Sequence, residues 1–426
     1  MDRYFFVRTA SLYGTVILTA LVCVWRRPSQ RSWIAAGLGF VWNVPIILAL
    51  HILAMRMGWW RFDAEGGLLL GMPVDLWLTW AWLWGAIPLL AFPHVHLGAA
   101  VLVALGFDLV FMPAAAPVLH LGPDWLTGEA LALGFGFIPG QLLARWTARD
   151  QHLPARAVLQ MIAFTGLVML IVPVAAIEGS NAQWINPLER PLWQLSLIVQ
   201  LLAVPGVLGV SALQEFVERG EGTPVPFDPP RRIVTSGVYA YVRNPMQVSA
   251  VLLLLILGVV LGNLWIAVAG VMAHLYSVGL AGWDEDEDLR RRFGDAWTDY
   301  RRDVRSWIPR CRPAVLPGQH AQLFVAESCG VCHEVGTWFV RRQARGLTIV
   351  PAETHPSREL SRVTYEAADG TTVSGVAAIA RALEHIHLGW AFLGFAVRLP
   401  VVVQLAQLIV DASGGGPRRI ARLTSH

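Results

Sequence analysis

Long apolar runs separated by short polar segments dominate the first two thirds of the chain. A helix needs about 20 mainly apolar residues to cross the hydrocarbon core of a bilayer, and most of these runs reach or approach that length. The runs occupy residues 10–25, 33–55, 74–92, 95–112, 128–146, 158–177, 191–213, 248–261 and 264–281. The pattern predicts a mostly α, polytopic helical membrane protein with about nine spans. The last two runs are short and are expected to form a tight hairpin at Gly262 and Asn263.

Arginine residues concentrate after alternate runs, and this asymmetry predicts how the chain crosses the membrane. Those that follow the first, fifth, seventh and ninth runs are Arg26, Arg27, Arg31, Arg145, Arg149, Arg156, Arg231, Arg232, Arg243, Arg290, Arg291, Arg292, Arg301, Arg302 and Arg305. The opposite loops carry Arg56, Arg61 and Arg190, and Arg3 and Arg8 precede the first run. Cytoplasmic loops are enriched in basic residues. We therefore expect a bacterial-type inner membrane protein with its N-terminus outside and its C-terminus in the cytoplasm.

Composition agrees with a membrane protein and excludes one class of function. The 426 residues are 55% hydrophobic and 15% charged, whereas soluble domains average about 25% charged residues. The formal charge is only +3, and the arginines lie at membrane boundaries rather than in one basic stripe, so no nucleic-acid partner is expected. Asp108 lies within an apolar run. An acid at that depth indicates either a functional group or a polar contact between helices.

The pattern changes near Pro313, where a linker with Pro317 and Gly318 separates the apolar region from a smaller α/β segment. The expected elements are a strand at 322–326, a helix at 334–345, a strand at 347–351, a hairpin formed by 363–367 and 371–374, and a helix at 376–386. This order is typical of a small cytoplasmic thioredoxin-like domain. The apolar tail at 388–410 is broken by Arg398 and Pro400, so it is predicted to be a packed or interfacial helix pair, with a tenth span as the alternative.

Polar clusters flank the predicted hairpin on both sides. Before it stands Ser-Gly-Val-Tyr-Ala-Tyr-Val-Arg-Asn-Pro at residues 236–245, and after it an acidic run at 284–288 leads into an aromatic and basic segment that ends at Pro309. Polar clusters beside membrane segments commonly serve function. Because the two ends of a hairpin meet at one membrane face, these clusters are expected to form a site for a small charged molecule.

The flanks of the hairpin resemble the isoprenylcysteine carboxyl methyltransferase and phospholipid methyltransferase superfamily of membrane enzymes. The matching positions are Gly237, Tyr239, Arg243, Asn244, Pro245, Glu285, Leu289, Phe293, Gly294, Tyr300 and Pro309. The chain departs from the pattern at Gln247, Asp286 and Trp297, where tyrosine, glutamate and tyrosine are usual in the family. The resemblance covers about a sixth of the chain. It implies an S-adenosylmethionine-dependent methyltransferase whose acceptor is a lipid-like or isoprenoid amphipathic molecule.

The resemblance also implies roles for individual residues. Arg243 and Glu285 are the expected catalytic residues, because a guanidinium pairs well with the carboxylate of S-adenosylmethionine and a carboxylate with its ammonium or hydroxyl groups. The cofactor-binding set would be Tyr239, Tyr241, Arg243, Asn244, Pro245, Glu285, Asp286, Phe293 and Tyr300, with the aromatic members forming a slot for adenine. The alternative is that Arg243 only anchors the chain at the cytoplasmic face and that the acidic run begins a solvated helix.

A Cys-x-x-Cys pair, Cys329 and Cys332, stands before the first predicted helix of the C-terminal segment. A thiol at a helix N-terminus has a lowered pKa and is nucleophilic, so the pair favours thiol redox chemistry with a thiol partner protein. The segment resembles thiol-disulfide oxidoreductases of the DCC type, and it departs from them where Ala326 and Glu327 replace the usual Asp-Gly. The alternatives are a zinc site and a plain buried pair. Because no second Cys-x-x-Cys follows, zinc is disfavoured and no metal site is expected.

These observations predict three parts: transmembrane helices of unassigned role at 1–190, a methyltransferase-like hairpin with its flanks at 191–312, and the thioredoxin-like domain at 319–412. The predicted function is methyl transfer from S-adenosylmethionine at the cytoplasmic face of the membrane. The alternative is a membrane-anchored thiol-disulfide oxidoreductase that uses Cys329 and Cys332.

Overall fold

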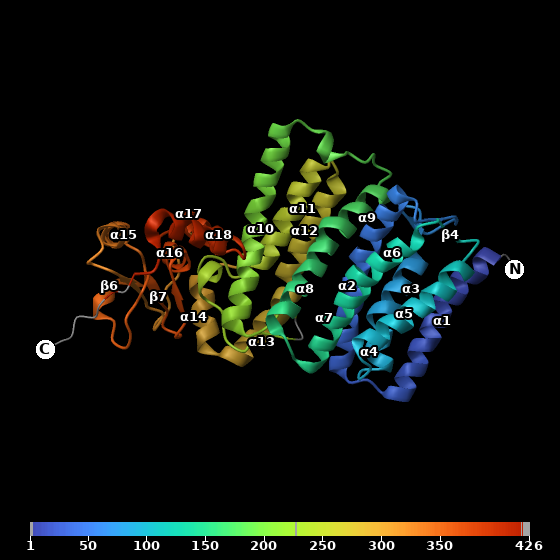
Figure 1. Ribbon diagram of the computed structural model, residues 1–426, viewed down its shortest axis with the longest axis horizontal. Coiled ribbons are helices and arrows are strands. Elements are labelled where there is room, and N and C mark those ends of the chain that lie inside the picture. The colour runs from blue at the N-terminus through green and yellow to red at the C-terminus, as the bar shows by residue number, and fades with distance from the viewer. Residues whose placement is uncertain (1–2, 226–227, 419, 421–426) are drawn as a thin grey trace. The chain divides into compact units, whose positions relative to one another are not determined.

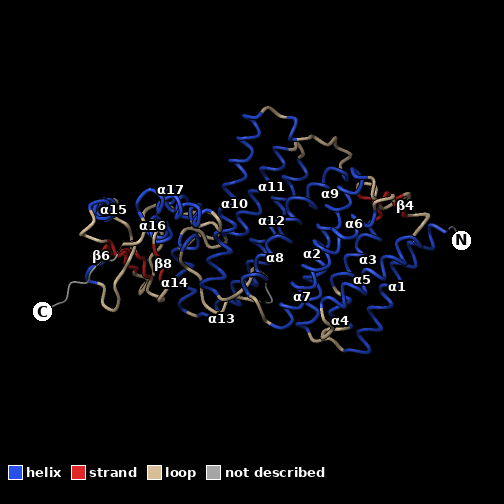
Figure 2. Tube along the Cα trace, viewed as in Figure 1, coloured by secondary structure: helices blue, strands red, loops and turns tan. Residues whose placement is uncertain are grey.

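Helices account for most of the computed structural model, which describes residues 3–225, 228–418 and 420 (Figures 1 and 2). Within these residues, seven helical stretches are long and apolar enough to cross a membrane. They are Phe5–Arg26, Gln30–Met57, Val74–Ala91, Leu97–Ala114, Trp125–Arg149, Leu153–Gly179 and Leu192–Gly220. The chain is therefore a helical membrane protein, and these seven coincide with the first seven runs expected from the sequence.

The last two apolar runs form shorter helices. They are α11 (Pro245–Val260) and α12 (Leu264–Tyr276), of 16 and 13 residues. At 1.5 Å per residue such helices fall short of a hydrocarbon core of about 30 Å. The turn between them is tight, because Gly262 adopts a positive φ of 63° and the Asn263 side chain accepts a hydrogen bond from the backbone N–H of Trp265 at 2.9 Å. The hairpin is as expected, whereas a full set of nine spans is not shown.

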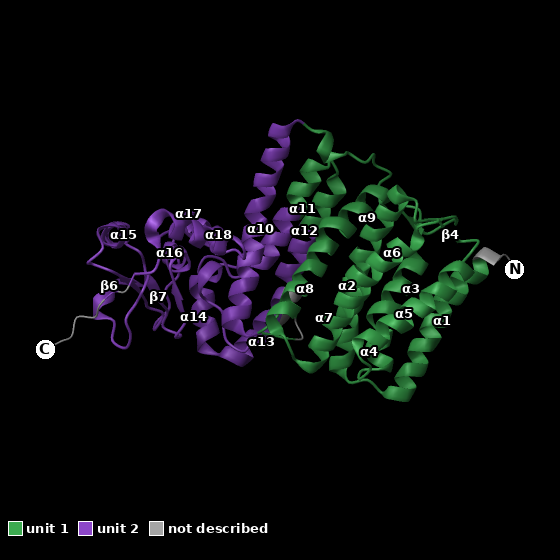
Figure 3. Ribbon diagram, viewed as in Figure 1, with its two compact units in different colours: residues 1–190, 222–229, 254–270 green, residues 191–221, 230–253, 271–426 purple. Residues whose placement is uncertain are grey.

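The chain divides into two compact units, coloured separately in Figure 3. The first comprises Met1–Arg190, Gly222–Pro229 and Leu254–Gly270, and the second comprises Pro191–Glu221, Pro230–Leu253 and Val271–His426. Each unit has its own buried clusters of apolar side chains, for example around Trp42 and Leu143 in the first and around Tyr241 and Phe395 in the second.

The first unit is built around α2 (Gln30–Met57), a helix with a largely buried face. The other helices of this unit are α1 (Arg3–Arg26), α3 (Val74–Gly85), α4 (Ile87–Ala91), α5 (Leu97–Ala114), α6 (Trp125–Ala132), α7 (Ile138–Arg149), α8 (Leu153–Gly166) and α9 (Val172–Gly179). Helix α2 approaches α3 so closely at Gly39 and Gly85 that a Cβ on either residue would overlap the backbone of the other. Short strands β1 (Trp60–Phe62) and β4 (Leu119–Leu121) pair antiparallel, and β2 (Leu68–Leu69) pairs antiparallel with β3 (Met72–Pro73).

The membrane-associated part of the second unit contains α10 (Leu192–Gly220), the start of α11, and the polar helices that follow α12. A π-helical turn at Ser277–Ala281 leads from α12 into α13 (Gly282–Phe293), and α14 (Asp295–Asp303) follows after Gly294. Gly294 has a φ of +53°, a region that glycine enters without steric cost, so it permits the sharp change of direction between α13 and α14.

The C-terminal part of the second unit is a four-stranded sheet with strand order β6-β5-β7-β8. The strands are β5 (Ala321–Val325), β6 (Leu347–Pro351), β7 (Thr364–Glu366) and β8 (Thr372–Ser374); β5 and β6 are parallel, and the other neighbours are antiparallel. Helix α15 (Gly330–Arg341) connects β5 to β6, and α16 (Val376–Leu383) follows β8. The elements lie where alternating and helical patterns predicted them, although α15 begins four residues earlier than the predicted start at 334.

The apolar tail folds as α17 (Leu388–Val397) and α18 (Val402–Val410), with an 89° bend between them. The break falls at the Arg398 and Pro400 that the sequence suggested, and Val401 adopts a positive φ of 70° there. A pair bent this sharply fits the predicted helix pair better than a tenth straight span.

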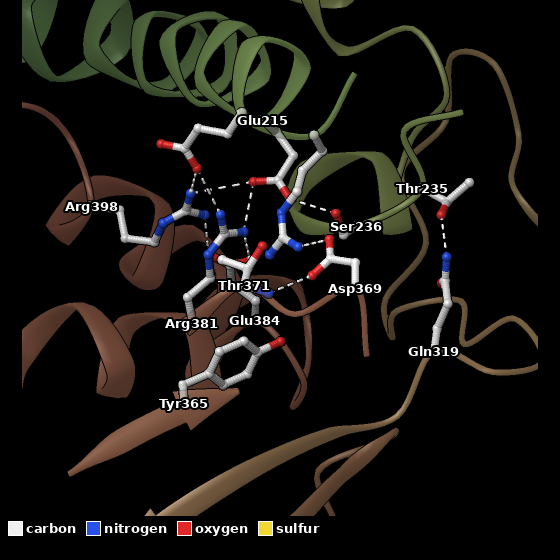
Figure 4. Close-up of polar contacts among 12 residues, drawn as sticks. Glu215, Thr235, Ser236, Gln319, Tyr365, Asp369, Thr371, Arg381, Glu384 and Arg398 are labelled. Atoms are coloured by element: carbon white, nitrogen blue, oxygen red, sulfur yellow. Dashed lines mark hydrogen bonds and ion pairs between the residues drawn. The ribbon is translucent and has the colours of Figure 1, made fainter. Parts of the chain in front are cut away.

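A buried ion network joins α10 to α16 and α17 (Figure 4). Glu215 on α10 is 1% exposed, and it accepts hydrogen bonds from Arg381 at 2.6 Å and from the Ser236 hydroxyl at 2.5 Å. Arg398 lies 3.3 Å from the same carboxylate and 2.6 Å from Glu384. Arg219 joins the same network, so three buried or nearly buried arginines surround two buried acids. The partly exposed Glu218 and Asp369 supply further negative charge, and the network fixes the end of α10 against the C-terminal helices.

Candidate active site

The segment before α11 begins with a short 3-10 helix, Gly237–Ala240, that lies against α10. Gly237 has a φ of +59°, and a Cβ added there would lie 2.7 Å from the Glu215 carboxyl carbon. Glycine is therefore required by both the backbone conformation and the lack of space. Glu215 holds this turn through Ser236 as well, so the buried ion network supports the segment that leads to Arg243.

Backbone hydrogen bonds place Arg243 and Asn244 beside the chain that follows α14. The N–H of Arg243 donates to Arg305 at 2.9 Å, and the N–H of Asn244 donates to Ser306 at 3.2 Å. The residue before a proline favours an extended conformation, which suits pairing of this kind before Pro245 begins α11. The two flanks of the hairpin are thereby brought together, as the sequence predicted.

A partly open cavity of about 290 Å³ lies where these flanks meet. That volume is close to the lower end of the range for small-molecule sites in proteins, roughly 300–1,000 Å³. Its walls combine charged groups of both signs with three indole rings. The lining residues are Arg243, Asn244, Ser277, Val278, Gly282, Trp283, Glu285, Asp286, Trp297, Arg301, Ser306 and Trp307.

Arg243 is oriented in this cavity by two neighbours. Its guanidinium donates to the Ser306 hydroxyl and lies 5.3 Å from the centre of the Trp297 ring, a cation–π distance. Burial lowers the pKa of Arg243, which nevertheless stays a cation because its ordinary pKa is so high. The cavity therefore presents a positioned, partly desolvated positive charge.

Glu285 supplies a carboxylate in the same cavity. Among the residues that the structure describes, none forms a hydrogen bond or ion pair with this side chain. The surrounding protein raises the pKa of Glu285, and the nearby Arg243 charge opposes that rise. A carboxylate without a fixed partner, close to a cation, is available to a ligand or to a proton.

Asp286 is used differently, because its carboxylate already has protein partners. The indole N–H of Trp297 donates to it at 2.9 Å, and Arg301 and Arg290 form ion pairs with it. Asp286 therefore ties α13 to α14 at the cavity wall. Two of the positions at which the chain departs from the pattern described above, Asp286 and Trp297, are thus direct hydrogen-bond partners.

The tyrosines expected to form an adenine slot lie elsewhere. The hydroxyl of Tyr300 donates to the Tyr239 carbonyl at 2.9 Å, and that of Tyr241 donates to the Glu384 carbonyl at 2.7 Å. All three side chains are buried, and burial raises the pKa of each. They hold the flanks together from within the core, and neither they nor Phe293 and Pro245 line the cavity.

The aromatic walls are instead Trp283, Trp297 and Trp307. Sequence reasoning missed Trp283 and Trp307 as site residues, together with Ser306 and Arg301. A usable signal was present, since both tryptophans stand in the polar stretch beside the hairpin, where an indole combines an apolar face with one N–H donor.

The C-terminal cysteines lie at the start of α15. Cys329 is the N-cap residue, Cys332 lies in the first turn, and both are free thiols. Hydrogen bonds from the backbone and the thiol of Cys332 lower the pKa of Cys329, whereas burial raises the pKa of Cys332 to about 11. Such a difference suits a nucleophilic first thiol. In the described part of the chain, no group of three or more His, Cys, Asp or Glu residues is arranged to hold a metal ion.

Comparison with known proteins gave one result. No curated protein and no solved structure matched the chain. Residues 193–296 match the family model described as Phospholipid methyltransferase. The matched segment runs from α10 through the hairpin to the start of α14 and contains both Arg243 and Glu285. The match supports assigning this part of the chain to the membrane-bound methyltransferases that act on lipid-like substrates.

Proposed function

We propose that the protein transfers a methyl group from S-adenosylmethionine to a lipid-like or isoprenoid amphipathic acceptor. The observation that carries this proposal is the cavity in which Arg243 and Glu285, from opposite flanks of the hairpin, lie among three indole rings. The match of residues 193–296 to phospholipid methyltransferases supports it independently. The isoprenylcysteine carboxyl methyltransferase-like type is the finer assignment that we propose within this class.

The charged and aromatic residues of the cavity suit the chemical groups of the cofactor. S-adenosylmethionine carries a carboxylate, an ammonium, a sulfonium and an adenine ring. Arg243 would hold the carboxylate, because it is already oriented by Ser306. Glu285 would hold the ammonium or the ribose hydroxyls. The indoles would stack on the adenine ring or cover the sulfonium, because aromatic faces attract a cation.

The cofactor supplies an electrophilic methyl group, and the protein supplies positioning, water exclusion and, for some acceptors, a base. An acceptor that is already an anion needs little proton transfer, so alignment of the reactants would dominate catalysis. A hydroxyl or amine acceptor must lose a proton. Glu285 is the candidate base, because its raised pKa brings it closer to neutral pH, where general bases act best.

The proposal is tested by methyl transfer into lipid. Purified protein in nanodiscs is incubated with S-adenosylmethionine carrying a radioactive methyl group and with a total bacterial lipid extract. We expect radioactivity to move into the organic phase, and to do so only with intact protein. Saturable cofactor binding combined with no transfer to any lipid or isoprenoid fraction would contradict a lipid-like acceptor.

We further propose that the cavity opens on the cytoplasmic side of a bacterial-type inner membrane. The asymmetry of the arginines carries this proposal. In a variant that retains Cys329 as its sole cysteine, a membrane-impermeant maleimide should label inverted vesicles and leave intact cells unlabelled. Labelling in intact cells would reverse the orientation.

We also propose that the C-terminal sheet is a thioredoxin-like domain with a thiol pair of its own. The strand order β6-β5-β7-β8, with a helix that begins at Cys329, supports this. Mild oxidation should join Cys329 and Cys332, as shown by a mass loss of about two daltons per chain. A Cys329→Ser, Cys332→Ser variant should lose this change and keep its cofactor affinity within about 0.5 kcal/mol, because the cavity residues lie elsewhere. Weaker cofactor binding would show that the two sites are coupled.

A further inference from the structure

The first unit contains an apolar cavity that the methyl-transfer proposal does not use. It measures about 80 Å³, is partly open to the surroundings, and lies among α2, α3, α5, α6 and the strand β1. Apolar and aromatic side chains form nearly all of its wall, including Leu76, Trp77, Trp84 and Met112. A cavity of this composition suits the hydrocarbon part of a lipophilic molecule rather than a polar metabolite, and its open side leaves room for a longer chain to extend outward.

Two buried polar atoms in the wall have no hydrogen-bond partner among the described residues: Oε1 of Glu129 and Nδ1 of His51. Both residues are 2% exposed and both line the cavity. The other His51 nitrogen lies 2.9 Å from the Leu70 carbonyl, which can only accept, so that nitrogen donates and Nδ1 is an acceptor. The wall therefore offers two hydrogen-bond acceptors, and a buried acceptor that stays unpaired is destabilising.

A second buried acid, Asp108, lies near Glu129. Asp108 is fully buried and accepts from the indole N–H groups of Trp80 at 3.1 Å and Trp84 at 3.2 Å. Asp108 and Glu129 are close enough to interact, and two neighbouring buried carboxyl groups favour sharing one proton. Apart from such a shared proton, the described residues supply no hydrogen-bond donor to Oε1 of Glu129.

We propose that this cavity binds a lipophilic molecule whose polar end is a hydrogen-bond donor, such as a long-chain alcohol. The hydroxyl donates to Glu129 or His51, and the adjoining hydrocarbon lies in the tryptophan-rich space. The rest of a longer chain extends through the open side of the cavity. Water alone is a poor occupant, because an ordered internal water typically needs about three polar partners and this wall is almost wholly apolar. The site belongs to the first unit, so the test of this proposal does not depend on whether the cofactor binds at Arg243.

The test uses 10-(pyren-1-yl)decan-1-ol and its methyl ether as a matched pair of probes. They differ only in the donor hydrogen, and energy transfer from tryptophan to pyrene reports binding in nanodiscs. We expect the wild-type protein to bind the alcohol about tenfold more tightly than the ether, equivalent to about 1.4 kcal/mol. Equal affinity for both probes, or no saturable binding, would overturn the proposal.

Two variants locate the site. Glu129→Met keeps the length of the side chain and removes the acceptor, so it should lower affinity for the alcohol to that for the ether. Leu76→Trp should fill the cavity and abolish binding of both probes. Leu102→Trp is the control, because Leu102 on α5 is 70% exposed and does not line the cavity. If Leu76→Trp does not fold, Glu129→Met alone tests the proposal. A Glu129→Met protein that still binds the alcohol more tightly than the ether would refute it.

Discussion

Replacing Glu215 with glutamine is expected to lower the free energy of unfolding by about 3–5 kcal/mol, the usual cost of removing one partner from a buried ion pair. The substitution preserves the shape of the side chain and removes its charge. Arg381 and Arg398 would then face each other across a site that is closed to water, with Glu384 as the remaining buried acid. Because Glu215 also contacts Ser236 and crowds Gly237, the turn before Arg243 should loosen as well.

The measurement is reversible unfolding in mixed detergent micelles, followed by circular dichroism. Glu287→Gln is the matched control: Glu287 pairs with Arg291 on an exposed face of α13, where an ion pair contributes at most about 1 kcal/mol. Similar stability of the Glu215 and Glu287 variants would show that the buried network does not form.

The helices of the first unit could be predicted because hydrophobicity alone determines them. The run at 33–55, for instance, became α2 with little change at either end. The shorter helices α11 and α12 were predicted as a hairpin because Gly262 and Asn263 are strong turn formers. The early start of α15 was missed because helix propensity is weak at Gly330 and Cys332, whereas Cys332 in the first turn packs against the core of the sheet domain.

Local pattern also brought Arg243 and Glu285 together, since they flank one short hairpin. The partners of Tyr241 could not be foreseen in this way, because its hydroxyl is taken by the carbonyl of Glu384, 143 residues further along the chain. The Glu215–Arg381 pair spans 166 residues. Such contacts depend on how the domains of the second unit pack, and a tyrosine that serves the core has the same sequence appearance as one that lines a site.

Replacing Arg243 with alanine is expected to weaken S-adenosylmethionine binding by about 2–4 kcal/mol, roughly 30-fold to several hundred-fold in Kd. The guanidinium is the cation of the cavity that has no carboxylate partner in the described residues, whereas Arg301 is paired with Asp286. Its loss would leave the cofactor carboxylate desolvated and unpaired. Arg302→Ala provides the control, because Arg302 is exposed on α14 and lies outside the cavity.

The most direct test of this assignment is a calorimetric titration of the purified wild-type protein with S-adenosylmethionine, beside the Arg243→Ala and Arg302→Ala variants. The account predicts one site per chain in the wild type, unchanged affinity in Arg302→Ala, and at least a 30-fold loss in Arg243→Ala with the fold retained. No binding by the wild type, or equal affinity in all three proteins, would contradict it.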